Sequence, residues 1–241
     1  TYDGKPHSVK VTKTDASKHY TITYGTTEND CTLNDSPEYT NKGAYKIYFK
    51  VVDNDTQAEH VGYVTLTISP AEVTVKVKDV TITYGDTPAF SYTVTGLVEG
   101  ETLSGEAAYT VKTLSGEEIN IGAGTDAGVY DISVSGLSAS NNYNVLPFVS
   151  GKLTINKKEA KVDWTIAENY VYSPEGQTLP TATYDGNPAN LIFTKDGKAC
   201  EFKNAGTYTV TVKDDNNYTL SGETTKTITI NKAKYTSVTA H

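Results

Sequence analysis

The chain has 241 residues, of which 37% are hydrophobic, and a formal net charge of −8. All 21 basic residues are lysines, so the sequence lacks the arginine fork that reads phosphates and base edges, and its negative charge opposes a nucleic-acid backbone. We therefore expect no nucleic-acid partner, and no membrane insertion within this segment either, because no apolar run approaches the roughly 18 residues of a membrane helix.

The chain opens on Tyr2-Asp3-Gly4-Lys5-Pro6, with no alternating strand before it. Further along, Asn41-Lys42-Gly43-Ala44-Tyr45 leads into a segment in which apolar and polar residues alternate, and the alternation returns between Val64 and Ile68. A period of two residues is typical of a strand with one buried face. The sequence therefore predicts a β repeat over residues 1–70 that lacks its first strand.

The same elements return twice. Asp126-Ala127-Gly128-Val129-Tyr130 and Asn204-Ala205-Gly206-Thr207-Tyr208 each lead into an alternating strand. A polar loop follows in both copies, with Asn141-Asn142-Tyr143 in one and Asn216-Asn217-Tyr218 in the other. This self-similarity predicts further repeats over 71–158 and 159–232. Residues 233–241 then begin a following repeat or form a tail, and the absence of Met leads us to expect a segment from inside a longer chain.

The element Asn/Asp-x-Gly-x-Tyr resembles the tyrosine corner of immunoglobulin-like folds, in which a tyrosine hydroxyl bonds the backbone just upstream. We expect Tyr45, Tyr130 and Tyr208 to be largely buried in this way. A glycine two residues earlier in each copy permits a positive φ at the corner. These glycines are Gly43, Gly128 and Gly206.

Short alternating strands in units of roughly 70–90 residues predict an all-β fold of tandem immunoglobulin-like β-sandwich repeats that form an elongated rod. The opening Tyr84-Gly85-Asp86-Thr87-Pro88, the run from Val94 to Glu101 and the Gly-x-Tyr elements resemble MBG-type (YGX) and related bacterial immunoglobulin-like repeats. The middle repeat matches best. The resemblance implies display on the cell surface by large surface proteins and adhesins, largely of gut bacteria, and the family name suggests mucin binding.

No catalytic, metal or cofactor site is expected. The histidines before the last residue, His7, His19 and His60, all lie in polar surroundings of the first repeat, and no nucleophile elbow accompanies them. The acidic loops 53–55 and 214–217 offer oxygen ligands for Ca²⁺ but lack the spacing of an EF-hand, so hairpin turns are the favoured interpretation. Cys31 and Cys200 fall in different repeats, so we expect no disulfide between them, and such a cysteine-poor extracellular protein suits a Gram-positive cell wall.

Two functions remain open. The favoured hypothesis is a non-enzymatic, monomeric spacer or stalk within a secreted, surface-attached adhesin-like protein, because short linkers leave little slack between repeats. The alternative is a module that directly binds host glycans or mucin, a host protein or a dietary polysaccharide. Loops at the ends of the sandwiches or an exposed sheet face would then carry the contacts. A Lys–Asn/Asp isopeptide cross-link within a repeat is a third feature that the sequence leaves open.

Overall fold

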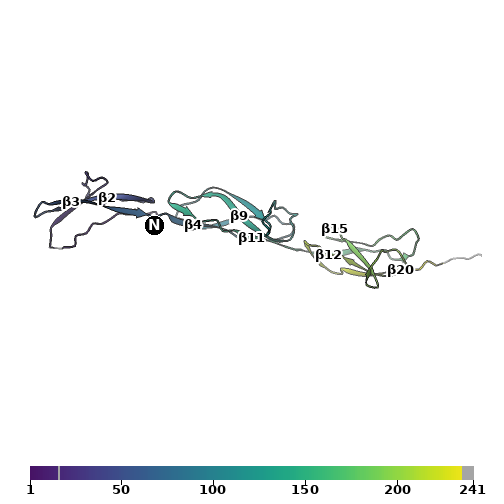
Figure 1. Ribbon diagram of the computed structural model, residues 1–241. Helices are drawn as coiled ribbons and strands as arrows, with labels where there is room; N and C mark the ends of the chain where they lie inside the picture. The colour runs from purple at the N-terminus through teal and green to yellow at the C-terminus, as the bar shows by residue number, and fades with distance from the viewer. Residues whose placement is uncertain (16, 235–241) are drawn as a thin grey trace, which may run out of the picture. The chain divides into compact units, whose positions relative to one another are not determined.

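The computed structural model describes residues 1–15 and 17–234, and within this part every regular element is a β-strand (Figure 1). Strands account for 52% of the residues, so the all-β prediction is confirmed. No helix in these residues could span a membrane. The segment predicted to begin a following repeat falls largely on residues 235–241, which lie outside the described part.

Contacts group the chain into two compact units. Unit one comprises residues 1–78, 90–112 and 131–152, and unit two comprises 79–89, 113–130 and the residues from 153 onward. Two strands, β9 (Gly128–Ser138) and β11 (Gly151–Asn156), run from one unit into the other. The boundaries 1–70, 71–158 and 159–232 stay a prediction, and below we use "first", "middle" and "third" repeat for these sequence segments.

Unit one contains two three-stranded sheets and one strand pair. The first sheet has the antiparallel order β1-β2-β3, and the second has β4 between a parallel β10 and an antiparallel β6. Strand β7 pairs with β9 and completes the unit. The bounds are β1 (Tyr20–Gly25), β2 (Gly43–Asp53), β3 (Glu59–Ile68), β4 (Ala71–Val77), β6 (Tyr92–Thr95), β7 (Ser104–Lys112) and β10 (Tyr143–Val145).

Unit two contains a four-stranded sheet of order β15-β14-β12-β19 and a five-stranded sheet of order β13-β20-β18-β16-β17. In the same unit β5 runs parallel to β11, and β8 is a short strand. The bounds are β5 (Val80–Thr83), β8 (Glu118–Ile119), β12 (Lys158–Thr165), β13 (Tyr170–Val171), β14 (Thr181–Tyr184), β15 (Asn187–Pro188), β16 (Leu191–Lys195), β17 (Lys198–Ala199), β18 (Gly206–Val212), β19 (Tyr218–Ser221) and β20 (Thr225–Asn231).

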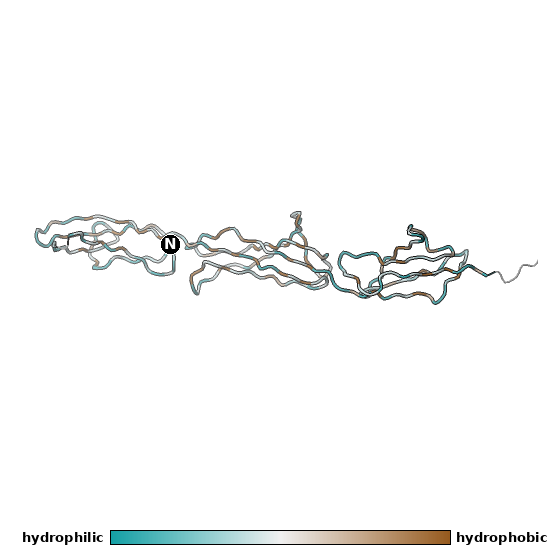
Figure 2. The backbone as a smooth tube through the Cα atoms, turned by 90° about the horizontal axis from the view of Figure 1, so that it is seen from below, coloured by the Kyte–Doolittle hydropathy of each residue, from teal (hydrophilic) through white to brown (hydrophobic). Residues whose placement is uncertain are grey.

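The alternation in the sequence becomes alternation of burial, and hydrophobic and hydrophilic residues interleave along the strands in Figure 2. On β4, Val73, Val75 and Val77 are fully buried while the residues between them are not. Side chains of successive strand residues point to opposite faces, so one face of each strand forms the core. Trp164 packs between the two hydrophobic clusters of unit two, and its indole N–H donates to the carbonyl of Glu223 at 2.6 Å.

Candidate functional site

The three corner tyrosines make the same hydrogen bond. Each hydroxyl donates to the backbone carbonyl oxygen four residues earlier, at 2.9 Å for Tyr45 and 2.7 Å for Tyr130 and Tyr208. Each bond closes a loop at the start of β2, β9 or β18. The carbonyl that receives it belongs to the Asn or Asp that opens the sequence element, so both ends of the element are tied together.

The burial of these rings differs from one corner to the next. Tyr208 is fully buried, at 2% exposed, because the ring of Phe202 packs on it with centroids 4.9 Å apart. Tyr45 and Tyr130 are half-buried. The ring of Tyr45 is covered on one side by Tyr39, which stacks on it at 3.9 Å. The three rings are thus covered to different extents, and Tyr208 is the most buried of them.

The corner glycines also serve different purposes. Gly206 has a φ of +146°, as the sequence predicted, but neither Gly43 nor Gly128 adopts a positive φ. At Gly43 the constraint is space, because a Cβ would lie 2.8 Å from Cζ of Tyr45. At Gly128 the nearest atom of Tyr130 would be 3.6 Å away, which is ordinary contact. A shared backbone conformation is therefore absent: a positive φ explains Gly206, lack of space explains Gly43, and neither explains Gly128.

The corner of the first repeat is held by an asparagine of the middle repeat, within unit one. Asn142, from the Asn-Asn-Tyr element, donates its side-chain amide to Oδ1 of Asn41 at 2.9 Å. Its own Oδ1 accepts the backbone N–H of Lys42, also at 2.9 Å. The backbone carbonyl of Asn142 accepts the N–H of Ala71 at the start of β4. One residue thus fastens the corner of one repeat to the first strand of the next.

The corner of the middle repeat is held in the same way by the third repeat, within unit two. Asn217 donates its side-chain amide to Oδ1 of Asp126 at 2.8 Å and accepts the backbone N–H of Ala127 at 2.7 Å. Its backbone carbonyl accepts the N–H of Lys158 at the start of β12. A carboxylate can only accept and a backbone N–H can only donate, so the orientation of this amide is fixed by its partners.

A pair of tyrosines accompanies each of these two asparagines. In unit one the ring of Tyr2 meets the ring of Tyr143 edge to face, with centroids 5.3 Å apart. In unit two Tyr84 meets Tyr218 in the same manner, also at 5.3 Å. Such edge-to-face pairs favour a defined mutual orientation. We call the two side-chain hydrogen bonds of Asn142 or Asn217 a clamp, and each clamp together with its tyrosine pair a joint. Tyr2 and Tyr84 are the opening tyrosines of their repeats.

An acid binds the tyrosine hydroxyls in the first joint. The carboxylate of Glu101 accepts the hydroxyl of Tyr143 at 2.6 Å and that of Tyr2 through its other oxygen. The two donors, that of Tyr143 first, hold the pKa of Glu101 below its usual value. Hydrogen bonding to Glu101 raises the pKa of Tyr2, and burial followed by the same carboxylate raises that of Tyr143. The N–H of Val98 donates to the Tyr143 hydroxyl at 2.9 Å.

Asp185 takes the place of this acid in the second joint. It accepts the hydroxyl of Tyr218 at 3.0 Å and forms an ion pair with the Lys158 ammonium at 2.7 Å. The hydrogen bond from Lys158, followed by that from Tyr218, lowers the pKa of Asp185, and the same contact raises the pKa of Lys158. In both joints, therefore, a charged carboxylate accepts the hydroxyl of the tyrosine in the Asn-Asn-Tyr element.

Residues 73–154 match the family of the MBG domain, YGX type. The middle repeat is an MBG domain. A comparison with curated proteins finds no match for the chain. Several joint residues lie inside the matched range: the MBG domain supplies Tyr84 and Asp126 to the second joint, and Glu101, Asn142 and Tyr143 to the first. The elements that mark an MBG domain in this sequence are thus largely the ones that contact the neighbouring repeats.

One element of the joints can be seen in the sequence as a repeat. The Asn-Asn-Tyr element recurs in the MBG domain and in the third repeat, where the sequence alone indicates a polar loop. Its partners lie far away along the chain, 101 residues for Asn142 and 91 residues for Asn217. Asp185 has no such signal, since it lies in a turn outside the repeated elements, with a φ of +49°.

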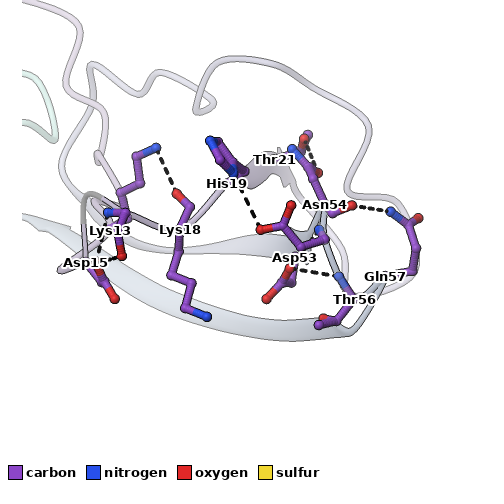
Figure 3. A network of polar contacts seen from close by, with 11 residues as sticks. Lys13, Asp15, Lys18, His19, Thr21, Asp53, Asn54, Thr56 and Gln57 are labelled. Atoms are coloured by element: carbon purple, nitrogen blue, oxygen red, sulfur yellow. Dashed lines mark hydrogen bonds and ion pairs between the residues drawn. The ribbon is translucent and has the colours of Figure 1, made fainter.

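The loop 53–55, one of the two acidic loops considered for Ca²⁺, forms a local turn. Figure 3 shows the turn after β2, where the carboxylate of Asp53 accepts the backbone N–H groups of Asp55 and Thr56 at 2.9 and 3.0 Å. These bonds, that of Thr56 first, lower the pKa of Asp53. His19 Nδ1 lies 3.5 Å from Asp55 in the same network. No cluster of three or more His, Cys, Asp or Glu residues suited to a metal occurs among residues 1–15 and 17–234.

The two cysteines are both free: Cys31 is partly exposed and Cys200 is exposed.

Proposed function

We propose that this chain is a non-catalytic spacer segment of an extracellular bacterial surface protein, built from tandem immunoglobulin-like sandwiches in series. The MBG domain is typical of repeats in such proteins. In this proposal the chain carries no active site and acts as a monomer, holding a functional module away from a cell wall. Adhesin-like parents of Gram-positive gut bacteria are the setting that we propose for it.

The observation that carries the spacer proposal is the construction of the joints. Ser69 and Pro70 alone separate β3 from β4, and Lys157 alone separates β11 from β12. Across the first joint, Tyr2 and Ile68 share one buried cluster with Val73 of the next repeat. A short linker, a shared apolar cluster and a two-point amide clamp all oppose bending. A module that only binds a ligand would not need such contacts with its neighbours at both ends.

A pair of spin labels across the second joint tests the stiffness. Cys200 is exposed and Leu114 is 66% exposed, so a Cys31→Ser, Leu114→Cys variant offers one label in the MBG domain and one in the third repeat. The spacer proposal expects a narrow distance distribution by pulsed electron resonance. It also expects that adding Asn217→Ala broadens the distribution. A broad distribution in the parent variant would overturn the proposal.

A second candidate function, direct binding of glycans, has one observation in its favour. Tyr48 and Tyr63 are paired across β2 and β3 with centroids 5.8 Å apart, and Tyr63 is 56% exposed. Aromatic rings on an exposed sheet face can stack on sugars. The ammonium of Lys46 covers the Tyr63 ring at 4.6 Å, which reduces the area open to a sugar. Binding to a glycan array or to mucin that Tyr63→Ala removes and Thr65→Ala keeps would favour this function.

A further inference from the structure

In each joint the earlier repeat contributes two elements that the following repeat contacts: its opening tyrosine, and its corner Asn or Asp with the N–H after it. The third repeat carries both elements. The opening tyrosine is Tyr172, whose N–H donates to the carbonyl of Asn231 at 2.8 Å. The equivalent bonds run from Tyr2 to Ser69 and from Tyr84 to Asn156, also at 2.8 Å. The corner asparagine is Asn204, whose carbonyl receives the hydroxyl of Tyr208. A backbone bond at Tyr172 and a tyrosine hydroxyl bond at Asn204 therefore match the bonds at the same places in the two joints.

In the third repeat no other repeat among the described residues contacts these two elements. Tyr172 is 37% exposed, whereas Tyr2, its counterpart in the first joint, is 7% exposed. Asn204 is exposed, and within residues 1–15 and 17–234 neither its side chain nor the N–H of Ala205 has a hydrogen-bond partner. In the joints the corresponding groups are Asn41 or Asp126 and the N–H that follows each, and all of them are bonded.

We propose that Tyr172, Asn204 and Ala205 form a docking surface for the Asn-Asn-Tyr end of a further repeat joined after β20. The incoming second asparagine would donate its amide to Oδ1 of Asn204 and accept the N–H of Ala205. The incoming tyrosine would meet Tyr172 edge to face and donate its hydroxyl to a carboxylate of its own repeat. This inference concerns assembly, so it holds for a spacer and for a binding segment alike.

The chemistry selects this occupant because a side-chain amide offers a donor and an acceptor in one plane, matching a corner that presents one of each. A second copy of the same chain has no such end to offer. Asn142 and Asn217 are already engaged. In the first repeat, the hairpin between β2 and β3 has the turn of Figure 3 at this place, with Asp53 bonded to its own backbone. The occupant is therefore an additional repeat that carries its own Asn-Asn-Tyr element.

An extended chain tests the proposal. In this variant, residues 1–232 are followed directly by a second copy of residues 71–158. The last strand of the third repeat is then separated from the first strand of the appended copy as in the two joints, where the next strand begins shortly after Ile68 and Ile155. Amide exchange measured by NMR is expected to slow at Ala205 by about tenfold or more relative to the unextended chain, in keeping with one added net hydrogen bond. Unchanged exchange at Ala205, with the appended copy folded, would overturn the proposal.

Matched variants of the extended chain separate docking from mere proximity. Asn142→Ala in the appended copy is expected to restore fast exchange at Ala205, whereas Asn141→Ala is not. Asn204→Asp is expected to dock, because Asp126 fills the same place in the second joint, and Asn204→Ala is expected to fail. Equal exchange in all four variants would refute the clamp. An appended copy that fails to fold in this place would also count against the proposal, because residues 71–158 fold directly after Ile68.

Discussion

The side-chain amide of Asn217 lies against the carboxylate of Asp126, 91 residues earlier in the chain, with 2.8 Å between Nδ2 and Oδ1. The same asparagine accepts the N–H of the residue after Asp126, so both polar groups of one side chain are used on one corner. Asn142 repeats this geometry on Asn41. The corner thus has two tasks: its tyrosine ties the corner internally, and its first residue receives the neighbouring repeat.

Removing the clamp should loosen the second joint without unfolding either neighbour. We expect Asn217→Ala to speed amide exchange at Ala127 and to cost about 1 kcal/mol, the net value of a typical protein hydrogen bond. Amide exchange by NMR and urea unfolding measure the two effects. Asn216→Ala is the matched control, because Asn216 is the exposed first asparagine of the same element. Equal effects of the two substitutions would contradict the clamp.

The first joint should weaken in acid through Glu101. Hydrogen bonds from Tyr143 and Tyr2 lower the pKa of this carboxyl in the folded chain, so its contribution is complete above its usual value of 4.5. As the pH falls below that value, protonation of Glu101 progressively removes the contribution. We expect the difference in melting temperature between the parent chain and Glu101→Gln to shrink from pH 6 to pH 3.

A nearby acid provides the control for this titration. Glu99 lies in the same loop and is exposed. The difference between the parent chain and Glu99→Gln should change much less over the same pH range. If the two substitutions behave alike, the acid sensitivity belongs to the net charge of the chain and not to the joint.

The corner tyrosines should differ in their importance for stability. Tyr208→Ala is expected to cost about 3 kcal/mol or more, because it removes a ring that is only 2% exposed. Tyr130→Ala should cost less, since that ring is half-buried. Replacing any one of the three with Phe removes only the hydroxyl bond and should cost about 1 kcal/mol. Urea unfolding monitored by circular dichroism gives these values, and equal costs for the two alanine variants would argue against this ranking.

The corner glycines offer a sharper contrast. Gly43→Ala should destabilise the first repeat, because its Cβ would lie 2.8 Å from the Tyr45 ring and push it off Tyr39. Gly128→Ala meets nothing closer than 3.6 Å and has no positive φ, so it should be nearly neutral. Thermal unfolding of the two variants measures the difference. A cost at Gly128 as large as at Gly43 would mean that the glycine serves another purpose.

The sequence predicted the strands and the hydroxyl partners of the corner tyrosines well, because both depend on local spacing. The alternation of Val73, Val75 and Val77 needs no distant residue to identify a half-buried strand. The burial of Tyr45 and Tyr208 could not be ranked in this way, since it depends on whether Tyr39 or Phe202 covers the ring. Those neighbours come from loops whose path no periodicity describes.

The sequence by itself determined the all-β class, the repeated corner and the MBG identity of the middle segment. These follow from periodicity and short motifs, which are properties of neighbouring residues. Only the tertiary structure showed that Asn142 and Asn217 each fasten one repeat to the corner of the repeat before it. The reason is physical: a side-chain amide bonds whatever donor and acceptor the folded chain brings within 3 Å, and nothing in its own sequence neighbourhood names them.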